Sequence, residues 1–270
     1  MKETYGKNVF ITGVSSGIGK YTAIAFAKQG YYVTGVSRHC KEGIRRYKSG
    51  GYIRFVQMDV TDEERVRYVL SKVDEVNVLV LSAGCGIGGA VAEVPTELLR
   101  KQMDVNYFGA ASVIREVIPK MHAQGGGLIV AIGSLAGRVS IPMQSAYSAS
   151  KYALEALIEA LRIEERDYGV KATIVDLGDT KTGFTDAREV YVEEGSCYQE
   201  DVEHAIGVME HDEMNGQSPI KAAKAIFRLS TMSNPPHRIT VGKVNKAFMT
   251  AIKHLPDKTI ENLVTKMYME

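Results

Sequence analysis

A tyrosine and a lysine four positions apart form the pair in this sequence best suited to moving a proton. Tyr147 and Lys151 lie in SAYSASKYALEAL, a stretch with the apolar spacing of a helix, where residues i and i+4 are neighbours. A free tyrosine has a pKa of about 10, and a nearby ammonium group lowers it. We therefore expect Tyr147 to exchange a proton with a carbonyl or alcohol oxygen near neutral pH, while Lys151 also reaches ribose hydroxyls. Such pairs are common on exposed helix faces, so this one needs support from its surroundings.

Two further polar residues give that support. Ser134 ends the apolar run LIVAIGS, thirteen residues before Tyr147. The carboxyl end of a strand in an open α/β sheet faces the ligand crevice, where a hydroxyl can bond the same substrate oxygen. Asn106 lies inside a predicted helix, where asparagine is unfavourable. Asparagine at that position indicates either a functional role for its polar side chain or a kink in the helix. The alternative is an ordinary surface residue.

The stretch TGVSSGIGK has the properties of a phosphate-binding turn. Gly13, Gly17 and Gly19 stand between a predicted strand and a predicted helix. Without side chains there, the backbone can approach a pyrophosphate, and the free N–H groups and dipole of the helix N-terminus favour the negative charge. A plain strand-to-helix turn is the alternative, although three glycines cost chain entropy that a turn alone does not require.

The end of the second predicted strand indicates which dinucleotide is bound. A site that prefers NAD usually has an acidic residue about 20 residues past the glycine turn, but here the residues are Ser37 and Arg38. A guanidinium group can bind a 2′-phosphate that a carboxylate would repel. The sequence therefore predicts NADP(H) rather than NAD(H), with a solvated loop arginine as the alternative.

The elements that must position these residues follow an alternating pattern. The predicted strands are Asn8–Thr12, Tyr32–Ser37, Ile53–Met58, Val78–Leu81, Leu128–Gly133 and Lys171–Asp176. The predicted helices are Gly17–Gln29, Glu63–Val73, Thr96–His122 and Ser145–Tyr168. Several strands are continuous apolar runs, which is typical of a parallel sheet covered on both faces. We expect an α/β fold, a Rossmann-type doubly wound parallel sheet with helices on both faces, as a single domain over residues 1–270.

The last third of the chain carries less pattern. From residue 179 to 217 we expect an irregular segment, with eleven acidic residues against Lys181 and Arg188, and interpret it as a lid. QSPIKAAKAIFRLS then predicts a helix capped by Ser218 with Pro219 in its first turn. A turn, a last strand at PPHRITVGK and a basic C-terminal helix follow, the last within an extension over about residues 243–270.

These motifs, in this order and spacing, resemble the short-chain dehydrogenase/reductase family over about residues 5 to 184. The matching positions are TGVSSGIG at 12–19, Asp59 with Val60, Ser-Ala-Gly at 82–84, Asn106, Ser134, Tyr147 and Lys151. The resemblance implies a nicotinamide cofactor and an Asn–Ser–Tyr–Lys catalytic group.

The same resemblance implies a role for each residue. Tyr147 is expected to be the general acid/base, and Ser134 to position the substrate oxygen. Lys151 is expected to hold the nicotinamide ribose and lower the pKa of Tyr147, and Asn106 to support a water-linked proton path. Asp59 and Val60 are expected to contact the adenine. The full set of expected cofactor contacts is Gly13, Ser15, Ser16, Gly17, Ile18, Gly19, Ser37, Arg38, Asp59, Val60, Ala83, Gly84, Tyr147, Lys151, Thr180 and Thr182.

Two positions depart from the family's pattern. Ser82 stands where the family usually has asparagine, although Ala83 and Gly84 can still lie along the ribose. Leu177 stands where proline is usual, which makes the entry to the loop of Thr180 and Thr182 less rigid. Neither change affects the expected proton chemistry.

Composition excludes several classes of protein. The chain has 270 residues, 45% of them hydrophobic, and a net charge of +1, so it offers no global attraction for nucleic acid or an anionic membrane. No apolar run is long enough for a membrane span, and the N-terminus lacks the features of a signal peptide. Cys40, Cys85 and Cys197 form no CxxC pair, so we expect reduced thiols and a cytoplasmic protein. The histidines lack metal-ligand spacing, and no metal is expected.

The expected substrate is a hydrophobic ketone, aldehyde or alcohol. Residues near the expected pocket are largely apolar, among them Leu135, Ile141, Met143 and Phe184. The chain is similar to hydroxysteroid and retinol dehydrogenase-like members, which favours a steroid-, retinoid- or lipid-like compound. Two alternatives remain, a reductase of carrier-bound β-ketoacyl chains and an NADP(H)-sensing protein without turnover. By resemblance we also expect a homodimer or homotetramer.

Overall fold

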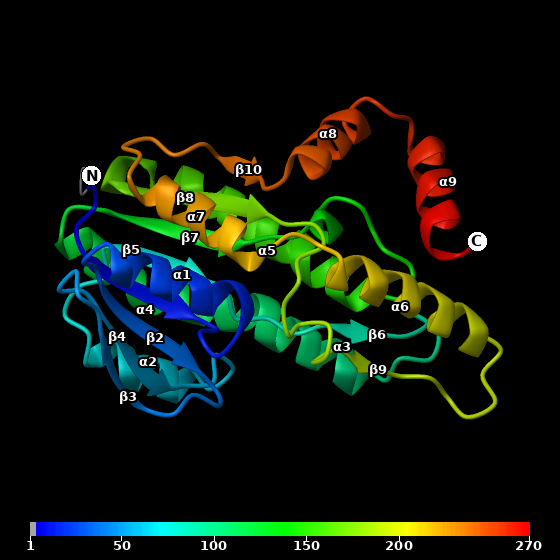
Figure 1. Cartoon of the computed structure of the whole chain (residues 1–270), viewed down its shortest axis with the longest axis horizontal. Helices are drawn as coiled ribbons and strands as arrows, with labels where there is room; N and C mark the ends of the chain where they lie inside the picture. Colours follow the sequence, from blue (N-terminus) through cyan, green and yellow to red (C-terminus); the bar gives the residue numbers. More distant parts are fainter. Residues whose placement is uncertain (1–3) are drawn as a thin grey trace.

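Successive side chains of the first strand point to opposite faces of one sheet and into two different cores. In β1 (Asn8–Thr12), Val9 and Ile11 pack into one apolar cluster, while Phe10 packs into the other. This alternation is the geometry of an extended strand, and the burial of both sets requires a covering layer on each face. The computed structural model describes residues 4–270 and shows these two layers (Figure 1).

The central sheet runs in the order β10-β8-β7-β5-β1-β2-β4-β3. Its other strands are β2 (Tyr32–Ser37), β3 (Gly43–Arg46), β4 (Tyr52–Gln57), β5 (Val78–Leu81), β7 (Gly127–Ile132), β8 (Val170–Asp176) and β10 (Arg238–Thr240). Every neighbouring pair is parallel except β3 with β4. The strand order changes direction at β1, which is the point where doubly wound sheets bind ligands. The predicted fold class is confirmed.

Helices cover both faces of this sheet. The helices are α1 (Gly17–Lys28), α2 (Glu63–Ser71), α3 (Thr96–Met103), α4 (Gly109–Ala123), α5 (Ser145–Glu164), α6 (Gln199–Met214), α7 (Pro219–Ser230), α8 (Lys243–Ile252) and α9 (Asp257–Tyr268). Buried residues of α1 and α7 share one apolar cluster with one face of the sheet, and those of α2, α4 and α5 share the other. All six predicted strands are present, each within one residue at both ends.

The long predicted helix at 96–122 contains the kink that Asn106 indicated. Between α3 and α4 the chain forms one turn of π-helix, Asp104–Phe108, with Asn106 buried inside it. A π turn widens the helix by one residue and is frequent at functional sites. Here it directs a polar side chain into the protein where a regular helix would have continued its apolar face.

The expectation of an irregular segment over 179–217 is wrong in one respect, because α6 occupies residues 199–214. The buried residues of α6, Val202, Ala205, Ile206 and Met209, have regular helical spacing. Frequent acidic residues between them obscured that spacing in the sequence. Before α6, the short strand β9 (Glu189–Val190) pairs with β6 (Ile87–Gly88), which holds this segment against the loop that follows β5.

In the rest of the C-terminal third, α7 and β10 lie where they were predicted, but two helices, α8 and α9, stand in place of the single helix expected after the last strand. Ser218 caps α7 through a hydrogen bond from the amide of Ile220, and Pro219 occupies the first turn. The last helix, α9, turns back toward α6, and its Tyr268 joins the apolar cluster on α6 (Figure 1). Among the helices of residues 4–270, none has both the length and the apolar character needed to cross a bilayer.

Candidate active site

The turn after β1 has no room for side chains at two of its glycines. Gly13 has a φ of +74°, and a Cβ added there would lie 2.8 Å from the amide nitrogen of Ala83. A Cβ on Gly19 would lie 2.2 Å from the carbonyl oxygen of Gly13. The Thr12 hydroxyl accepts hydrogen bonds from the amides of Ser82 and Ala83, both at 3.0 Å. The ends of β1 and β5 are therefore held together, with Ser82 in the place that the family gives to asparagine.

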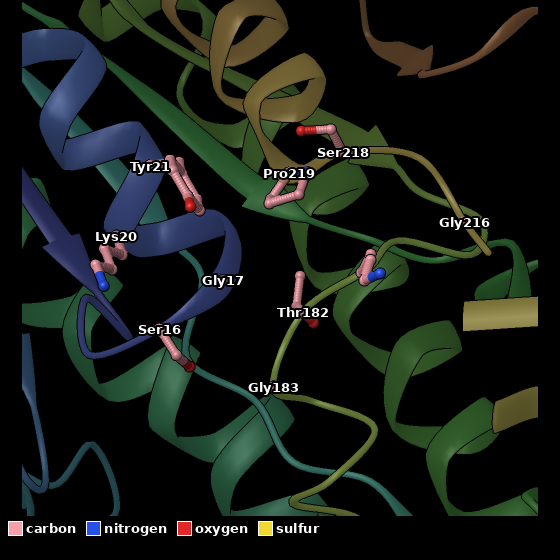
Figure 2. A pocket seen from close by; sticks show the side chains of 10 residues that line it. Ser16, Gly17, Lys20, Tyr21, Thr182, Gly183, Gly216, Ser218 and Pro219 are labelled. Atoms are coloured by element: carbon pink, nitrogen blue, oxygen red, sulfur yellow. The ribbon is translucent and has the colours of Figure 1, made fainter. Parts of the chain in front are cut away.

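The N-terminus of α1 faces a cavity that suits a phosphate group. Ser16 is the N-cap of α1, but within the described chain its side chain makes no capping hydrogen bond, so amides of the first helical turn stay available. The cavity has a volume of about 470 Å³. Figure 2 shows α1 on one side and the loop of Thr182 and Gly183 on the other. A Cβ on Gly17 would lie 3.1 Å from Thr182 Cβ. The residues present therefore fit a pyrophosphate.

A second cavity, of about 270 Å³, lies beside the end of β2. Several basic side chains line it together with Ser15, namely Lys20, His39, Lys41 and Arg45. Ser37 is buried, and its hydroxyl has no partner among residues 4–270. Arg38, the next residue in the chain, is exposed. The sequence identified Ser37 and Arg38, whereas the structure adds Arg45 from the antiparallel strand β3, which is separated from β2 by β4.

Three other expected cofactor contacts, Asp59, Val60 and Thr180, line neither of these two cavities. The Asp59 carboxylate accepts bonds from the amide and hydroxyl of Thr61, at 3.0 and 2.8 Å. Val60 is buried against Gly109. The Thr180 hydroxyl donates to the carbonyl of Gly178, at 2.8 Å. Thr182 lines the first cavity, whereas Thr180 is tied to its own loop, which makes Thr182 the better placed of the two.

The four expected catalytic residues come from three different parts of the fold. Tyr147 and Lys151 lie in the first turns of α5, and the Ser134 hydroxyl, which follows β7, forms a hydrogen bond with the Tyr147 phenol. The Ser134 hydroxyl also accepts a bond from the amide of Ala136, at 3.1 Å, which fixes its orientation. Lys151 Nζ is 5.7 Å from the centre of the Tyr147 ring and donates to the carbonyl of Ile132, at 2.9 Å.

The pKa of Tyr147 does not move in the direction that the sequence predicted. Burial raises it to about 12, and this effect outweighs the Ser134 hydrogen bond, which lowers it. The expectation of a phenol acidified by Lys151 is therefore wrong for this structure. Burial lowers the pKa of Lys151 itself to about 8, and its ammonium is bonded to a backbone carbonyl. Tyr147 is thus a phenol that holds its proton throughout the neutral range.

Asn106 joins the loop after β5 to α5. Its side-chain oxygen accepts from the amide of Cys85, at 2.9 Å, and its nitrogen donates to the carbonyl of Cys85 and the hydroxyl of Ser150, at 3.1 and 2.9 Å. Gln102, one helical turn earlier, donates to the same Cys85 carbonyl, at 2.7 Å, and accepts from the amide of Ile87. Gln102 and Asn106 are buried amide side chains four residues apart, and this spacing was the signal that both hold the loop at Cys85. The sequence alone had indicated only Asn106.

Behind Lys151 lies a buried charged group that the sequence analysis also missed. Glu155 and Asp176 are both buried, and burial raises the pKa of both carboxyl groups. Arg238 donates to Glu155 at 2.8 Å, and its Nε lies 3.2 Å from Asp176. The two carboxyl groups favour the charged form of Lys151 and oppose the effect of burial on it. Glu155, Asp176 and Arg238 lie in α5, β8 and β10, far apart in the sequence, so no local sequence pattern could predict that they form one group.

Comparison with known proteins identifies the family. Residues 7–190 match the short chain dehydrogenase family, which is more than half of the 270 residues. A curated relative, the 3-ketodihydrosphingosine reductase of Bacteroides thetaiotaomicron, is 35% identical over 267 residues, with 96% of this chain and 97% of that protein covered. The chain therefore belongs to the short-chain dehydrogenase/reductase family and is an oxidoreductase acting on CH–OH or carbonyl groups.

Solved structures agree with this assignment. A short-chain dehydrogenase from Streptomyces avermitilis has a TM-score of 0.80 and 29% identity, covering 98% of this chain and 97% of that one. ElxO with NADP bound has a TM-score of 0.69 and 26% identity, covering 89% and 99%. A Burkholderia phymatum enzyme in complex with NAD has a TM-score of 0.78 and 23% identity, covering 94% of each. Related folds therefore hold either dinucleotide.

Proposed function

We propose that this chain is an NADPH-dependent reductase of a long-chain ketone of the 3-keto sphingoid base class. The observation that carries the proposal is the placement of the Tyr147 phenol, bonded to the Ser134 hydroxyl, on the helix turn next to Lys151. The substrate class comes from the full-length similarity to a 3-ketodihydrosphingosine reductase. This class is a lipid ketone, in agreement with the hydrophobic substrate expected from the sequence.

The apolar side of the site supports a hydrophobic substrate. The Phe184 ring lies 5.5 Å from the Tyr147 ring, and Ile141 and Met143 pack against the apolar cluster of α6. Met143 has a φ of 57°, a conformation that non-glycine residues rarely adopt and that is frequent at binding sites. We propose that the segment 179–217 acts as a lid whose apolar face, carried by α6, covers the alkyl chain.

The mechanism assigns one step to each polar residue. When bound, the dinucleotide supplies a hydride to the carbonyl carbon. The Ser134 hydroxyl donates to the carbonyl oxygen and holds it beside the phenol, and Tyr147 gives that oxygen its proton, so that the ketone becomes an alcohol. The Lys151 ammonium stabilises the negative charge left on the phenol oxygen and binds hydroxyls of the ribose. Asn106 and Gln102 hold the loop after β5 in place.

The raised pKa of Tyr147 supports reduction as the favoured direction. A phenol with a pKa of about 12 is fully protonated at neutral pH and can act as an acid. Alcohol oxidation would require the phenolate, which burial disfavours. We therefore expect the rate of ketone reduction to exceed that of alcohol oxidation near pH 7.

We propose NADP(H) as the cofactor because cations surround the site expected for the 2′-phosphate. Arg38 directly follows β2, and Lys41 and Arg45 line the cavity beside the end of that strand. Arg38→Asp is expected to lower kcat/KM for NADPH by about tenfold or more, since a hydrogen bond to a charged group is worth about 1.5–3 kcal/mol, and to shift the preference toward NADH. Steady-state kinetics with both cofactors would measure this. A wild-type preference for NADH would refute the proposal.

The function is tested by following NADPH oxidation with a panel of ketones. The panel contains 3-ketodihydrosphingosine, a steroid ketone, a retinoid aldehyde and a carrier-bound β-ketoacyl chain. We expect the sphingoid ketone to give the highest kcat/KM. Preference for the carrier-bound chain would identify a β-ketoacyl reductase instead. Cofactor binding with no turnover of any compound would support the sensor alternative.

We also propose a homodimer or homotetramer formed through α4 and α5. Ile163 on α5 is 70% exposed and Phe108, just before α4, is 56% exposed, which is unusual for large apolar side chains on helices that otherwise bury one face. Light scattering is expected to give a mass of two or four chains, and Phe108→Glu with Ile163→Glu to lower it. A monomeric wild-type protein would contradict this assembly.

A further inference from the structure

One buried ion pair interrupts the apolar wall beside the reacting phenol. Arg188, which precedes β9, donates from Nη2 to one carboxylate oxygen of Glu213, near the end of α6. The Thr185 hydroxyl donates to the other oxygen, at 2.6 Å. The Arg188 side chain is 1% exposed and that of Glu213 is 15% exposed. Charged groups are rarely buried to this extent without a specific partner or task.

A single aromatic ring, that of Phe184, lies between this ion pair and the Tyr147 phenol. Arg188 Cζ is 5.9 Å from the centre of the Phe184 ring, and that ring is 5.5 Å from the ring of Tyr147. Both Glu213 and Arg188 are close enough to act on the charge of the Tyr147 phenol. The pair is therefore a charged neighbour of the Tyr147 phenol on the side of the Phe184 ring.

Part of the hydrogen-bonding capacity of the pair is unused by the chain. Arg188 Nε and Nη1 are buried and have no hydrogen-bond partner within residues 4–270. Each carboxylate oxygen of Glu213 accepts one bond and can accept more. Buried donors left without partners are costly. The pair therefore offers two free donors and spare acceptor capacity to a ligand.

The charge around the pair is negative overall. Burial raises the pKa of Tyr268 on α9, and the negative charges of Asp179, Asp212 and Glu213 raise it further. Burial also raises the pKa of Asp179, with a smaller contribution from Asp212. Within residues 179–217 there are eleven acidic residues against two basic ones, Lys181 and Arg188. This field favours a cationic group over a second anion, such as the acidic surface of an acyl carrier.

We propose that Arg188 and Glu213 form a head-group site that binds an amine and a hydroxyl next to the ketone, with Glu213 accepting from the ammonium group and Arg188 donating to the hydroxyl oxygen. This inference rests on the proposed reductase function and assigns the polar end of its substrate. In a 3-keto sphingoid base the amine stands on the carbon next to the ketone and the hydroxyl on the following carbon, and both would meet this pair when the ketone is hydrogen-bonded to Tyr147.

The test compares two ketones in the full-length protein with NADPH. One is 3-ketodihydrosphingosine, and the other is the analogue in which hydrogen replaces the amine. Glu213→Gln is expected to lower the ratio of kcat/KM for the amino ketone to kcat/KM for the analogue by about tenfold or more, because a bond to a charged group is lost. The matched control is Glu203→Gln, an exposed residue of the same helix bonded to Gln199, which should leave the ratio unchanged.

The ratio separates recognition from damage to the structure, because a general loss of packing lowers both rates together. Since Glu213→Gln leaves Arg188 buried without its partner, a second variant, Arg188→Met with Glu213→Leu, removes both charges and keeps the volume apolar. This double variant should lose the preference for the amino ketone over the analogue. NADPH binding, measured by fluorescence, would check that the variant is folded.

Two outcomes would overturn the head-group site, and they are distinguishable. If the wild-type protein reduces both ketones and neither variant changes the ratio, the site is refuted while the reductase function stands. If the wild-type protein reduces neither ketone, the reductase function fails and the head-group site fails with it.

Discussion

Replacing Tyr147 by phenylalanine is expected to lower kcat/KM for ketone reduction by about 10²–10⁴-fold, the usual contribution of a positioned general acid. The variant removes the only atom by which this ring can give a proton to the substrate oxygen, while the ring still packs at 5.5 Å from Phe184. The Ser134 hydroxyl remains fixed by the amide of Ala136 and can still hold the carbonyl. The loss should therefore appear mainly in kcat, with the dissociation constant of NADPH changed by no more than a few-fold.

A matched control exists on the same helix. Tyr152 lies five residues further along α5 and is 43% exposed, so Tyr152→Phe removes a hydroxyl without touching the site. It should retain wild-type turnover. Stopped-flow single-turnover kinetics would separate the chemical step from product release. If Tyr147→Phe kept more than a tenth of wild-type turnover, another group would have to be the proton donor.

Replacing Lys151 by methionine is expected to impair both catalysis and cofactor binding. The Lys151 ammonium is fixed by the carbonyl of Ile132, at 2.9 Å, and lies 5.7 Å from the centre of the Tyr147 ring. Loss of a preorganised donor at a developing charge costs about 10²–10³-fold in kcat. Loss of its bonds to the ribose should raise the dissociation constant of NADPH by about tenfold. Lys224→Met, an exposed lysine of α7, is the control.

The pH dependence of reduction gives an independent test of Lys151. Burial lowers its pKa to about 8, so the ammonium form predominates below pH 8 and is lost above it. Tyr147, with a pKa of about 12, keeps its proton over the same range. We therefore expect kcat/KM for reduction to fall above pH 8. Lys151→Arg keeps its charge at this pH and should move the fall to higher pH. Undiminished catalysis in Lys151→Met would refute the role.

The sequence was informative wherever a short segment determines its own structure. The turn after β1 needs glycine at Gly13 because of its φ of +74° and the nearness of Ala83, and the glycines were visible as a motif. Strands buried on both faces appear as continuous apolar runs, so their limits were predicted within one residue. The proximity of Tyr147 and Lys151 to each other follows from helix geometry alone, because residues four positions apart are neighbours on a helix. Asn106 was marked by its low helix propensity before the π turn was seen.

Properties that depend on distant segments could not be predicted in the same way. The helix α6 was missed because exposed acidic residues interrupt the apolar residues of its buried face in the sequence. Arg188 and Glu213 are twenty-five residues apart and meet only because β9 and α6 fold over the site. Glu155, Asp176 and Arg238 form one group from three elements of the sheet and its helix layer.

The sequence by itself determined the fold class and the glycine turn and predicted the proton donor, because each depends on residue type and short-range spacing. Only the tertiary structure decided how that donor behaves. Burial raises the pKa of Tyr147 to about 12 and lowers that of Lys151 to about 8. Desolvation is set by every segment packed around a group, and no pattern within one helix contains that information.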